Sequence, residues 1–454
     1  MHIAVIGTGY VGLVSGVCFS EYGFTVTCVD RDANKIAQLQ QHIMPIYEPG
    51  LEQLVEANRK AGRLGFTTDL KSAVSTADVI IIAVGTPQND TDGMPDLRAL
   101  EAACAEVADA ISRYTVIVIK STVPVGTNRR IAKMISARNS DADFDVASNP
   151  EFLREGSAIK DFMSPDRVVV GVDSPRSRDV MTKLYSAICN DSVPLMFTTY
   201  ESAELIKYAA NSLLATKIAF INEMADICEK TGANIRDISR GIGLDKRIGD
   251  KFLQPGPGYG GSCFPKDTMA LKSIAQIAGV PSRIVEATIA TNGARKNKMV
   301  EKIIAANGGN VAGKIIAVLG VTFKPGTDDM RDSASLVIIP ALQEAGALIK
   351  AYDPQGMKEA EKHLTNVHWE NDAYSIMQDA DMLLILTEWN EFKSLDMKRV
   401  KSLLAKALIV DLRNIYKRLE MKTQGFRYVS IGRQEVIPGE PWISDLNIDD
   451  EKIA

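Results

Sequence analysis

The chain has 454 residues, of which 46% are hydrophobic and 24% charged, so it suits two or three globular domains rather than one. A net charge of −5 gives no reason to expect nucleic acid or an anionic membrane as a partner, and no apolar run approaches the ~20 residues that span a bilayer. The four histidines are scattered and the six cysteines form no C-x-x-C pair, so we expect no metal site and a reduced, cytoplasmic chain.

Short β-branched runs alternate with helical stretches over the first two hundred residues. The run at 79–84 is apolar throughout, which is typical of a strand buried on both faces of a parallel sheet. We therefore predict a doubly wound α/β domain of the Rossmann type over residues 1–198. Its expected strands are 2–6, 25–29, 79–84, 116–120, 145–148 and 167–171.

A central helical region is predicted at 199–300. Residues 200–230 contain no glycine or proline, and a helix of that length would run on the order of 45 Å. Such a helix could join two domains or form the seam of a homodimer. A further helix is expected at 267–298.

The pattern of the first domain returns over residues 310–433. Strand-like runs at 314–320, 348–353, 381–386 and 408–411 predict a second Rossmann-like sheet. This sheet has no G-x-G-x-x-G, so we expect it to bind a mononucleotide with its phosphate near Lys324, or to be purely structural. Residues 434–454 read as a polar tail.

The segment Gly7-Thr8-Gly9-Tyr10-Val11-Gly12 follows the first strand and opens a helix, and Asp30 ends the second strand. In that context G-x-G-x-x-G is the dinucleotide fingerprint, whose glycines let backbone N–H groups approach a pyrophosphate. Asp30 would accept hydrogen bonds from ribose hydroxyls and so favours NAD over NADP, with Lys35 weakening the preference slightly. The turns at 85–87 and 120–124 follow later strands, where cofactor and substrate meet in such sheets.

The loop at 254–267, Q-P-G-P-G-Y-G-G-S-C-F-P-K-D, cannot form regular structure. Its backbone N–H groups are expected to be exposed and able to hold a diphosphate. Cys263 ends the loop just before a predicted helix, and the helix N-terminus together with Lys266 would favour the reactive thiolate. The alternative is a small buried thiol, which is the fate we expect for the other five cysteines.

Lys207 and Asn211 lie four residues apart on one face of the long predicted helix. A partly buried ammonium beside an amide could stabilise a developing oxyanion, although a solvated helix face is the plainer alternative. Glu151 follows another strand end and is a candidate proton acceptor, or simply a turn carboxylate.

Seven motifs in chain order resemble the UDP-glucose 6-dehydrogenase family. They are G-T-G-Y-V-G, K-S-T-V-P-V-G-T, S-N-P-E-F-L-R-E-G, E-L-I-K-Y-A-A-N, G-Y-G-G-S-C-F-P-K-D, F-K-P-G-T-D-D-M-R-D-S and V-D-L-R. They run from Gly7 to Arg413 and so cover nearly the whole chain.

The resemblance implies an NAD-dependent, four-electron oxidation of a UDP-sugar alcohol to the carboxylate, through a thiohemiacetal and a thioester on Cys263. The implied catalytic residues are Cys263, Lys207, Asn211, Asp267, Glu151 and Thr122. The implied cofactor-binding residues are Gly7, Gly9, Tyr10, Val11, Gly12, Asp30, Lys35, Gly85, Thr86, Pro87, Thr122, Glu155, Lys266 and Arg331. The implied substrate-binding residues are Glu151, Phe152, Leu153, Glu155, Lys207, Asn211, Arg247, Tyr259, Gly260, Gly261, Phe323, Lys324 and Arg413, with Arg247 supplied across a homodimer interface.

Close relatives in this family oxidise GDP-mannose or UDP-N-acetylhexosamines, and the motifs around Arg167 and Arg247 look more like the UDP-glucose branch. A regulatory nucleotide-sugar-binding protein without catalysis is a rival of another class. A simple hydroxyacid dehydrogenase is a second rival, which would need one NAD per turnover and no cysteine.

Overall fold

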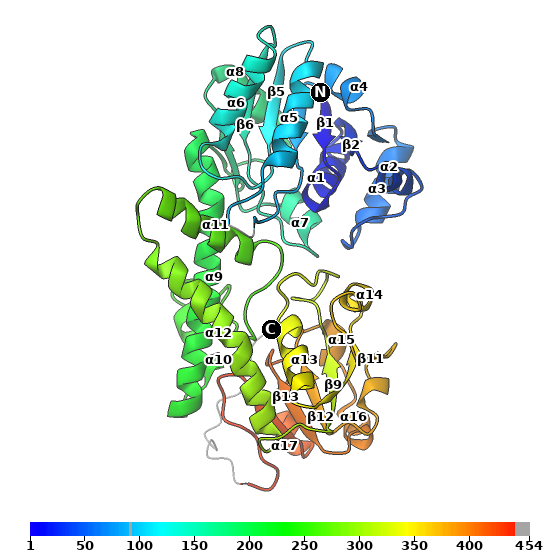
Figure 1. Ribbon diagram of the computed structural model, residues 1–454, viewed down its shortest axis with the longest axis vertical. Coiled ribbons are helices and arrows are strands. Elements are labelled where there is room, and N and C mark those ends of the chain that lie inside the picture. Colours follow the sequence, from blue (N-terminus) through cyan, green and yellow to red (C-terminus); the bar gives the residue numbers. More distant parts are fainter. Residues whose placement is uncertain (90–92, 441–454) are drawn as a thin grey trace. The chain divides into compact units, whose positions relative to one another are not determined.

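The computed structural model describes residues 1–89 and 93–440, so the predicted polar tail lies outside the described residues from 441 on. The chain forms two compact units, each built on one β-sheet with helices on both faces (Figure 1). Unit 1 comprises residues 1–211 and 266–282, and unit 2 comprises 212–265 and the chain from 283 on. Helix α9, Tyr200–Thr231, is the predicted long helix and contributes to both units. No helix in the described ranges has the length and apolar character of a membrane span.

The eight-stranded sheet of unit 1 has the order β3-β2-β1-β4-β5-β6-β7-β8. Neighbouring strands are parallel except for β6 and β7, which pair antiparallel. The strands are β1 His2–Ile6, β2 Thr25–Val29, β3 Leu64–Thr67, β4 Val79–Ile82, β5 Thr115–Ile119, β6 Phe144–Ser148, β7 Val168–Gly171 and β8 Leu195–Thr198. Six of them were predicted, whereas β3 and β8 were not.

Alternation of side chains along the strands separates two hydrophobic cores. In β4, Val79 and Ile81 join the core on one face of the sheet, and Ile80 and Ile82 join the core on the other. Helix α1 covers the first face and α5 the second, which is the doubly wound arrangement that the apolar run predicted. The helices of unit 1 are α1 Tyr10–Glu21, α2 Ala33–Gln40, α3 Leu51–Lys60, α4 Leu70–Ser75, α5 Arg98–Ala110, α6 Thr127–Arg138, α7 Ala158–Met163 and α8 Pro175–Tyr185.

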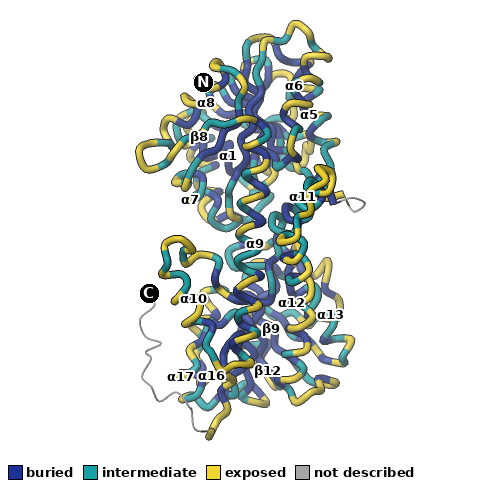
Figure 2. Tube along the Cα trace, turned by 90° about the vertical axis from the view of Figure 1, so that its left-hand side faces the viewer, coloured by how far each residue is buried: buried dark blue, intermediate teal, exposed yellow. Residues whose placement is uncertain are grey.

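Unit 2 repeats the strand order of the first half with a six-stranded parallel sheet, β11-β10-β9-β12-β13-β14. Strands β9 and β12 run through its buried interior, drawn in dark blue in Figure 2. The strands are β9 Ile315–Leu319, β10 Leu348–Tyr352, β11 Val367–Trp369, β12 Met382–Ile385, β13 Leu408–Asp411 and β14 Arg427–Ser430, of which β11 and β14 were not predicted.

The remaining helices include one correction. The single helix expected at 267–298 is two helices, α11 Phe264–Ile277 and α12 Arg283–Ala306. Gly279 has a φ of 71° and Pro281 follows it, so a left-handed C-terminal turn and a missing N–H end the first helix. The others are α10 Ile235–Gly243, α13 Ser335–Glu344, α14 Met357–Ala360, the 3₁₀ turn η1 Ser375–Met377, α15 Asn390–Lys393, α16 Met397–Leu403 and α17 Arg418–Thr423.

The glycines of the first strand–helix turn make a matched pair for testing the fold. A Cβ on Gly12 would lie 1.9 Å from the Gly7 carbonyl oxygen, whereas a Cβ on Gly9 would meet nothing within 4 Å. We expect Gly12→Ala to lower the melting temperature, because the clash is with backbone and costs ~1–3 kcal/mol as overpacking does. Gly9→Ala should leave it unchanged. Equal melting temperatures for the two variants in thermal unfolding would contradict the close helix–strand contact.

Candidate active site

The turn between β1 and α1 has the form of a dinucleotide-binding loop. Gly7 adopts a φ of 99°, and Gly9 caps α1 without any side-chain hydrogen bond to the helix N–H groups. The space beside Gly9 and beside Gly85 is open for 4 Å around an added Cβ. Open backbone and an uncapped helix N-terminus are what a pyrophosphate requires, so these residues fit NAD.

Asp30 lies at the end of β2 and already organises this turn. Its Oδ2 accepts hydrogen bonds from Thr8 N at 2.9 Å and from Thr8 Oγ1 at 2.7 Å, and Lys35 Nζ lies 3.3 Å away. Burial by itself raises the pKa of Asp30, but the Thr8 and Asp32 hydrogen bonds and the Lys35 charge lower it below its ordinary value. Asp30 is therefore held as an anion, the form that accepts from ribose hydroxyls.

Tyr10 and Val11 open α1, and Tyr10 connects this helix to the loop that contains Glu151. The Tyr10 hydroxyl bonds to Glu48 and accepts a hydrogen bond from Gly156 N at 2.8 Å. Burial, followed by the Glu48 carboxylate, raises the pKa of Tyr10 well above its usual range. The tyrosine therefore stays neutral, and its hydroxyl links the segment that contains Glu48 to the loop that contains Glu151 and Gly156.

The turns after β4 and β5 lie together at the carboxyl edge of the sheet. Thr86 Oγ1 donates to the Thr122 carbonyl at 3.0 Å, and Ser121 Oγ donates to the Val84 carbonyl at 2.7 Å. The predicted residues Gly85, Thr86, Pro87 and Thr122 are thus on adjacent strand ends. This is the edge at which doubly wound sheets bind their ligands.

An ion pair between Lys207 of α9 and Glu151 lies in the interior of unit 1. Lys207 Nζ is 3.0 Å from Glu151 Oε1, and the two side chains are 3% and 7% exposed. Burial by itself raises the pKa of Glu151, but the Lys207 charge, the Leu153 N–H and the Lys120 charge lower it below its ordinary value. Glu151 is therefore held as an anion beside the Lys207 ammonium.

One turn further along α9, Asn211 contacts the next predicted catalytic residue. Its Nδ2 donates to Asp267 Oδ2 at 2.6 Å, and Lys266 Nζ lies 2.5 Å from Asp267 Oδ1. Asp267 is fully buried. The spacing of four residues thus puts both polar pairs on one face of α9, as the sequence predicted.

The loop 149–156 wraps around Glu151. Leu153 N donates to Glu151 Oε2 at 2.6 Å. The Phe152 ring lies under the Arg167 guanidinium, at 3.7 Å from ring centroid to Cζ, and 5.4 Å from Lys207 Nζ. Glu155 is half-buried in the same loop.

The glycine-rich loop before Cys263 is clamped, contrary to the expectation of exposed N–H groups. Gly256 N donates to Asn222 Oδ1, Tyr259 N to Asn292 Oδ1 and Gly261 N to the Arg331 carbonyl, each at 2.8 Å. The expectation was wrong for these three groups, because they are consumed within unit 2 and cannot hold a diphosphate.

Cys263 is half-buried and immediately precedes α11. None of the six cysteines, all of which the structure describes, is in a disulfide. Cys18, Cys28 and Cys104 are buried, and burial raises the pKa of each thiol to about 12. We predicted the other five cysteines to be core residues; four of them are buried, and Cys189 is half-buried after α8 and packs against the core of unit 1.

Three predicted substrate residues of unit 2 surround the same loop. A Cβ on Gly261 would lie 2.6 Å from the Phe323 ring, and a Cβ on Gly260 would lie 2.4 Å from the Asp332 carbonyl oxygen. Arg413 donates to the Leu386 carbonyl at 2.7 Å and to the Phe323 carbonyl at 3.0 Å. The glycines are therefore required by close packing, and Phe323, Arg413 and Tyr259 are brought together around them.

Lys324, Arg331 and Arg247 are three further predicted residues of unit 2. Lys324 lies over the Phe323 ring at 5.4 Å. Arg331 pairs with Asp329 through two hydrogen bonds of 2.8 Å, and its side chain is 63% exposed. Arg247 pairs with Asp245 and is 88% exposed, so its own chain leaves it at the surface.

Several buried polar residues were not singled out from the sequence. Lys120 is 4% exposed, and its ammonium donates to Asn149 Oδ1 at 3.1 Å. Burial lowers the pKa of Lys120 to about 8. Glu204 of α9 accepts from Gly126 N at 2.6 Å and Asn128 N at 2.8 Å, which caps α6. The sequence did not indicate that these two side chains are buried, because burial of a polar residue is not visible in periodicity.

In unit 2, Asp353 occupies the place that Asp30 has in unit 1, at the end of the second strand. It is fully buried and accepts from Val321 N at 2.8 Å, Thr322 N at 3.2 Å and Gly356 N at 2.7 Å. This carboxylate is used by the chain itself. These hydrogen bonds join the turn after β9 to the turn after β10.

Three consecutive stretches match domains of one family. Residues 1–189 match the NAD binding domain of the UDP-glucose/GDP-mannose dehydrogenase family, 201–294 its central domain and 317–418 its UDP binding domain. A UDP-glucose 6-dehydrogenase of Rhizobium meliloti (strain 1021) is 55% identical over 96% of this chain and 100% of its own length. UDP-glucose 6-dehydrogenase TuaD of Bacillus subtilis (strain 168) is 48% identical over 97% of this chain and 95% of its own.

Among solved structures, a UDP-glucose dehydrogenase from the archaeon Pyrobaculum islandicum superposes with a TM-score of 0.88 at 34% identity, covering 95% of this chain and 98% of that one. The family models together match residues 1–189, 201–294 and 317–418, which is most of the chain. The chain therefore belongs to the UDP-glucose/GDP-mannose dehydrogenase family.

Proposed function

We propose that this enzyme oxidises UDP-glucose to UDP-glucuronate with NAD, through covalent intermediates on Cys263. The observation that carries the proposal is the single polar face of α9, where the Lys207–Glu151 and Asn211–Asp267 pairs lie one turn apart. The high identity to relatives named UDP-glucose 6-dehydrogenase supports the substrate.

NAD, when bound, supplies the two-electron oxidising capacity that each of two successive oxidations needs. The uncapped N-terminus of α1 and the open backbone at Gly9 would hold its pyrophosphate, with Gly7 and Gly12 shaping the turn. Asp30 would accept from the ribose hydroxyls, with Lys35 beside it. Thr86, Pro87 and Thr122 would line the same edge of the sheet.

Cys263 retains the substrate between the two oxidations. Its thiolate adds to the aldehyde carbon, so that a carbon–sulfur bond forms and the carbonyl π electrons move to the oxygen, which takes a proton. The second oxidation converts this thiohemiacetal to a thioester. Water then attacks the thioester carbon, the carbon–sulfur bond breaks, and the carboxylate and the thiolate are released.

Lys207 and Asn211 are positioned to stabilise negative charge on the reacting oxygen. Both are nine-tenths buried, so a hydrogen bond from either to an oxyanion is worth more than it would be in water. Before substrate binds, Glu151 neutralises the Lys207 charge, and Asp267 orients the Asn211 amide. Glu151 would then accept a proton, Asp267 would orient the hydrolytic water, and Thr122 would help to order water between them.

The UDP moiety is proposed to bind unit 2, which matches the family's UDP binding domain. Phe323, Lys324 and Arg413 lie on the loops after β9 and β13, close to Tyr259, Gly260 and Gly261. A planar guanidinium and an ammonium are suited to phosphate oxygens.

A homodimer is proposed from the exposed apolar residues of α9. Leu213, Phe220 and Ile227 recur every seven residues and are 64%, 46% and 51% exposed. A heptad stripe of this kind is typical of a helix that packs against another helix. The exposed Arg247 could then reach the site of a second copy.

The proposed reaction needs the Cys263 thiol in its reduced form. We therefore also propose that the enzyme works in the reducing cytosol.

The covalent step is tested by Cys263→Ser. We expect turnover to fall by on the order of 10³-fold or more, while NAD binding by unit 1 persists, because the fingerprint loop is untouched. The wild-type enzyme should form two NADH for each sugar acid, measured by absorbance against chromatography of the product. Near-normal turnover of the variant, or a ratio of one NADH, would contradict retention of the aldehyde on the enzyme.

The role of Glu151 as a proton acceptor is tested through its ion pair. In Lys207→Met the charge that most lowers the pKa of Glu151 is lost, so burial dominates and that pKa rises. Activity requires the anion and falls as pH drops through this pKa, so the acid limb of the kcat profile should move to higher pH. Lys207→Arg keeps the charge and should keep the limb near its wild-type position. An unmoved acid limb in the methionine variant would exclude Glu151 as the titrating base.

Substrate choice is decided by NADH formation with UDP-glucose, GDP-mannose and two UDP-N-acetylhexosamines. We expect kcat/KM to be at least ~10²-fold higher for UDP-glucose, because an acetamido group or a different base needs its own polar partners. A larger kcat/KM for GDP-mannose or an N-acetylhexosamine would assign the enzyme to another branch of the family. No NADH with any of them would favour a binding protein without catalysis.

A further inference from the structure

Three buried polar side chains hold the glycine loop that precedes the cysteine. Asn292 of α12 binds both backbone polar groups of Tyr259: its Oδ1 accepts from Tyr259 N at 2.8 Å, and its Nδ2 donates to Tyr259 O at 3.0 Å. Both the oxygen and the nitrogen of the Asn292 amide are therefore engaged with the loop. Asn292 is 9% exposed, so water cannot readily replace it.

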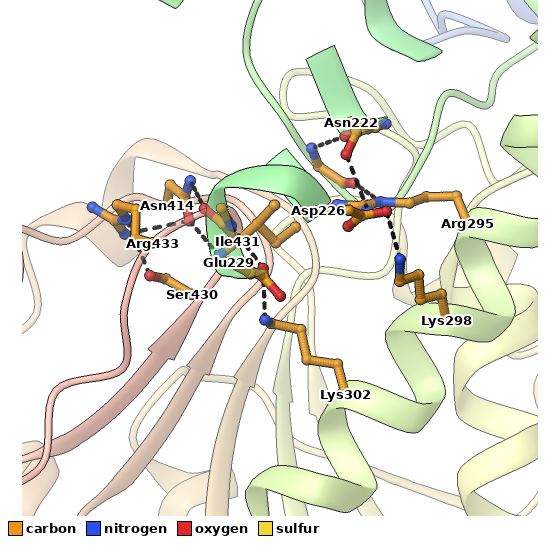
Figure 3. Close-up of polar contacts among 12 residues, drawn as sticks. Asn222, Asp226, Glu229, Arg295, Lys298, Lys302, Asn414, Ser430, Ile431 and Arg433 are labelled. Atoms are coloured by element: carbon orange, nitrogen blue, oxygen red, sulfur yellow. Dashed lines mark hydrogen bonds and ion pairs between the residues drawn. The ribbon is translucent and has the colours of Figure 1, made fainter. Parts of the chain in front are cut away.

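The beginning of the loop is held in the same way by two further residues. Gly256 N donates to Asn222 Oδ1 at 2.8 Å, and Gly256 O accepts from Arg295 Nε at 3.1 Å. Arg295 is 3% exposed and pairs with Asp226 at 2.5 Å, and Asp226 in turn pairs with Lys298 at 2.7 Å (Figure 3). The guanidinium is always charged, so this ion pair anchors it between α9 and α12.

The sequence of the loop is fitted to this clamp. Gly258 has a φ of 117°, and a Cβ there would lie 2.8 Å from Asn292 Oδ1. Glycine at this position therefore allows the asparagine amide to reach the neighbouring peptide of Tyr259.

The clamp determines how far Cys263 can move. Gly261 N is bonded to the Arg331 carbonyl, and the Phe264 ring packs at 6.0 Å from the Tyr259 ring and at 6.0 Å from the Phe252 ring. Only Ser262 and Cys263 lie between these two anchored residues. A two-residue tether confines the sulfur to a small volume, because each residue spans at most ~3.6 Å.

We propose that Asn292, Arg295 and Asn222 are positioning residues that fix the Cys263 thiol for its attack on the aldehyde. This inference rests on the proposed function. The three residues touch neither the sulfur nor a reacting atom, and they act through the backbone of residues 256–261. A misplacement of ~1 Å at a reacting atom costs on the order of 10²-fold in rate, so a small relaxation of the loop is enough to impair catalysis.

The test compares Asn292→Ala and Asn222→Ala with the wild-type full-length protein. For both variants we expect kcat to fall by about 10²-fold with little change in the affinity for NAD, which binds unit 1. Iodoacetamide alkylation of Cys263, followed by peptide mass spectrometry, should change at least fivefold in rate in the absence of substrate. Cys189, also half-buried but in unit 1, serves as the internal reference and should react at its wild-type rate.

Lys302→Met is the matched control. Lys302 lies on the same helix α12, where it pairs with Glu229 of α9 at 2.8 Å. The Lys302→Met substitution removes this partly buried ion pair (Figure 3). We expect it to lower the melting temperature without changing kcat or the rate of Cys263 alkylation. Having two test variants guards against the failure of either one to fold, which thermal unfolding reports.

A folded Asn292 or Asn222 variant whose kcat and Cys263 alkylation both stay within twofold of wild type would overturn the proposal. So would a loss of kcat without any change in alkylation, since that result would mean a role unrelated to the thiol. If the wild-type protein forms no NADH from UDP-glucose, the proposed function fails, whereas the alkylation measurement still reports whether the clamp controls the thiol.

Discussion

The buried charge of Lys207 is the constraint on which the organisation of unit 1 depends. An ammonium on a side chain that is 3% exposed cannot remain unpaired, and Glu151 is the carboxylate that satisfies it. Removing one partner of a buried pair costs ~3–5 kcal/mol, because the other charge is left uncompensated. The loop containing Glu151 is therefore tied to α9, and this tie determines where Phe152 and Leu153 lie.

Side chains on the same face of α9 also hold two other segments of unit 1 in place. Glu204 caps α6 and so fixes the turn after β5 that contains Thr122, and Asn211 binds Asp267 at the start of α11. Spacings of three and four residues along one helix thus place three separate segments relative to one another. Burial raises the pKa of Glu204, while its hydrogen bonds to Asn128 and Gly126 oppose that rise. A helix can organise an active site in this way because its rise per residue is fixed.

In unit 2, backbone groups satisfy several of the buried polar side chains, beside the ion pair of Arg295 with Asp226. Gly256 and Tyr259 satisfy Asn222, Asn292 and Arg295, and Val321, Thr322 and Gly356 satisfy Asp353. The first six strands of unit 1 and the six strands of unit 2 follow the same order. The acidic residues after the second strand, Asp30 and Asp353, nevertheless differ in how exposed they are. Asp30 keeps side-chain exposure of 12% beside an open turn, whereas Asp353 is sealed by its own chain.

Much of this architecture was predictable because strong, simple patterns encode it. Continuous apolar runs marked the central strands, and a stretch without glycine or proline marked α9. The strands β3, β8, β11 and β14 were missed because they lie at or near sheet edges, are three or four residues long, and carry mixed sequences such as Leu64–Thr67.

Site residues could be predicted where a reactive residue type stands at a characteristic spacing in the sequence. They could not be predicted where their role depends on burial in the folded protein. The fingerprint, the Lys207 and Asn211 spacing and the Cys263 loop were visible in the sequence. Asn292 and Arg295 were not, because an asparagine or arginine within a helical pattern is ordinarily solvated, and only tertiary packing shows that it is enclosed. The clamped state of the glycine loop was missed for the same reason, since composition predicts irregular backbone but not its partners.

The division of the chain bears on how the protein is made. Unit 1 includes residues 266–282, so the buried partner of Asn211 is synthesised only after the loop that contains Cys263. At ~5–20 residues per second, the nascent first sheet waits for seconds with this polar face uncovered. A fragment that stops halfway along α9 would carry every strand of the first sheet and still lack Asp267, so Asn211 would lose the carboxylate that accepts its hydrogen bond.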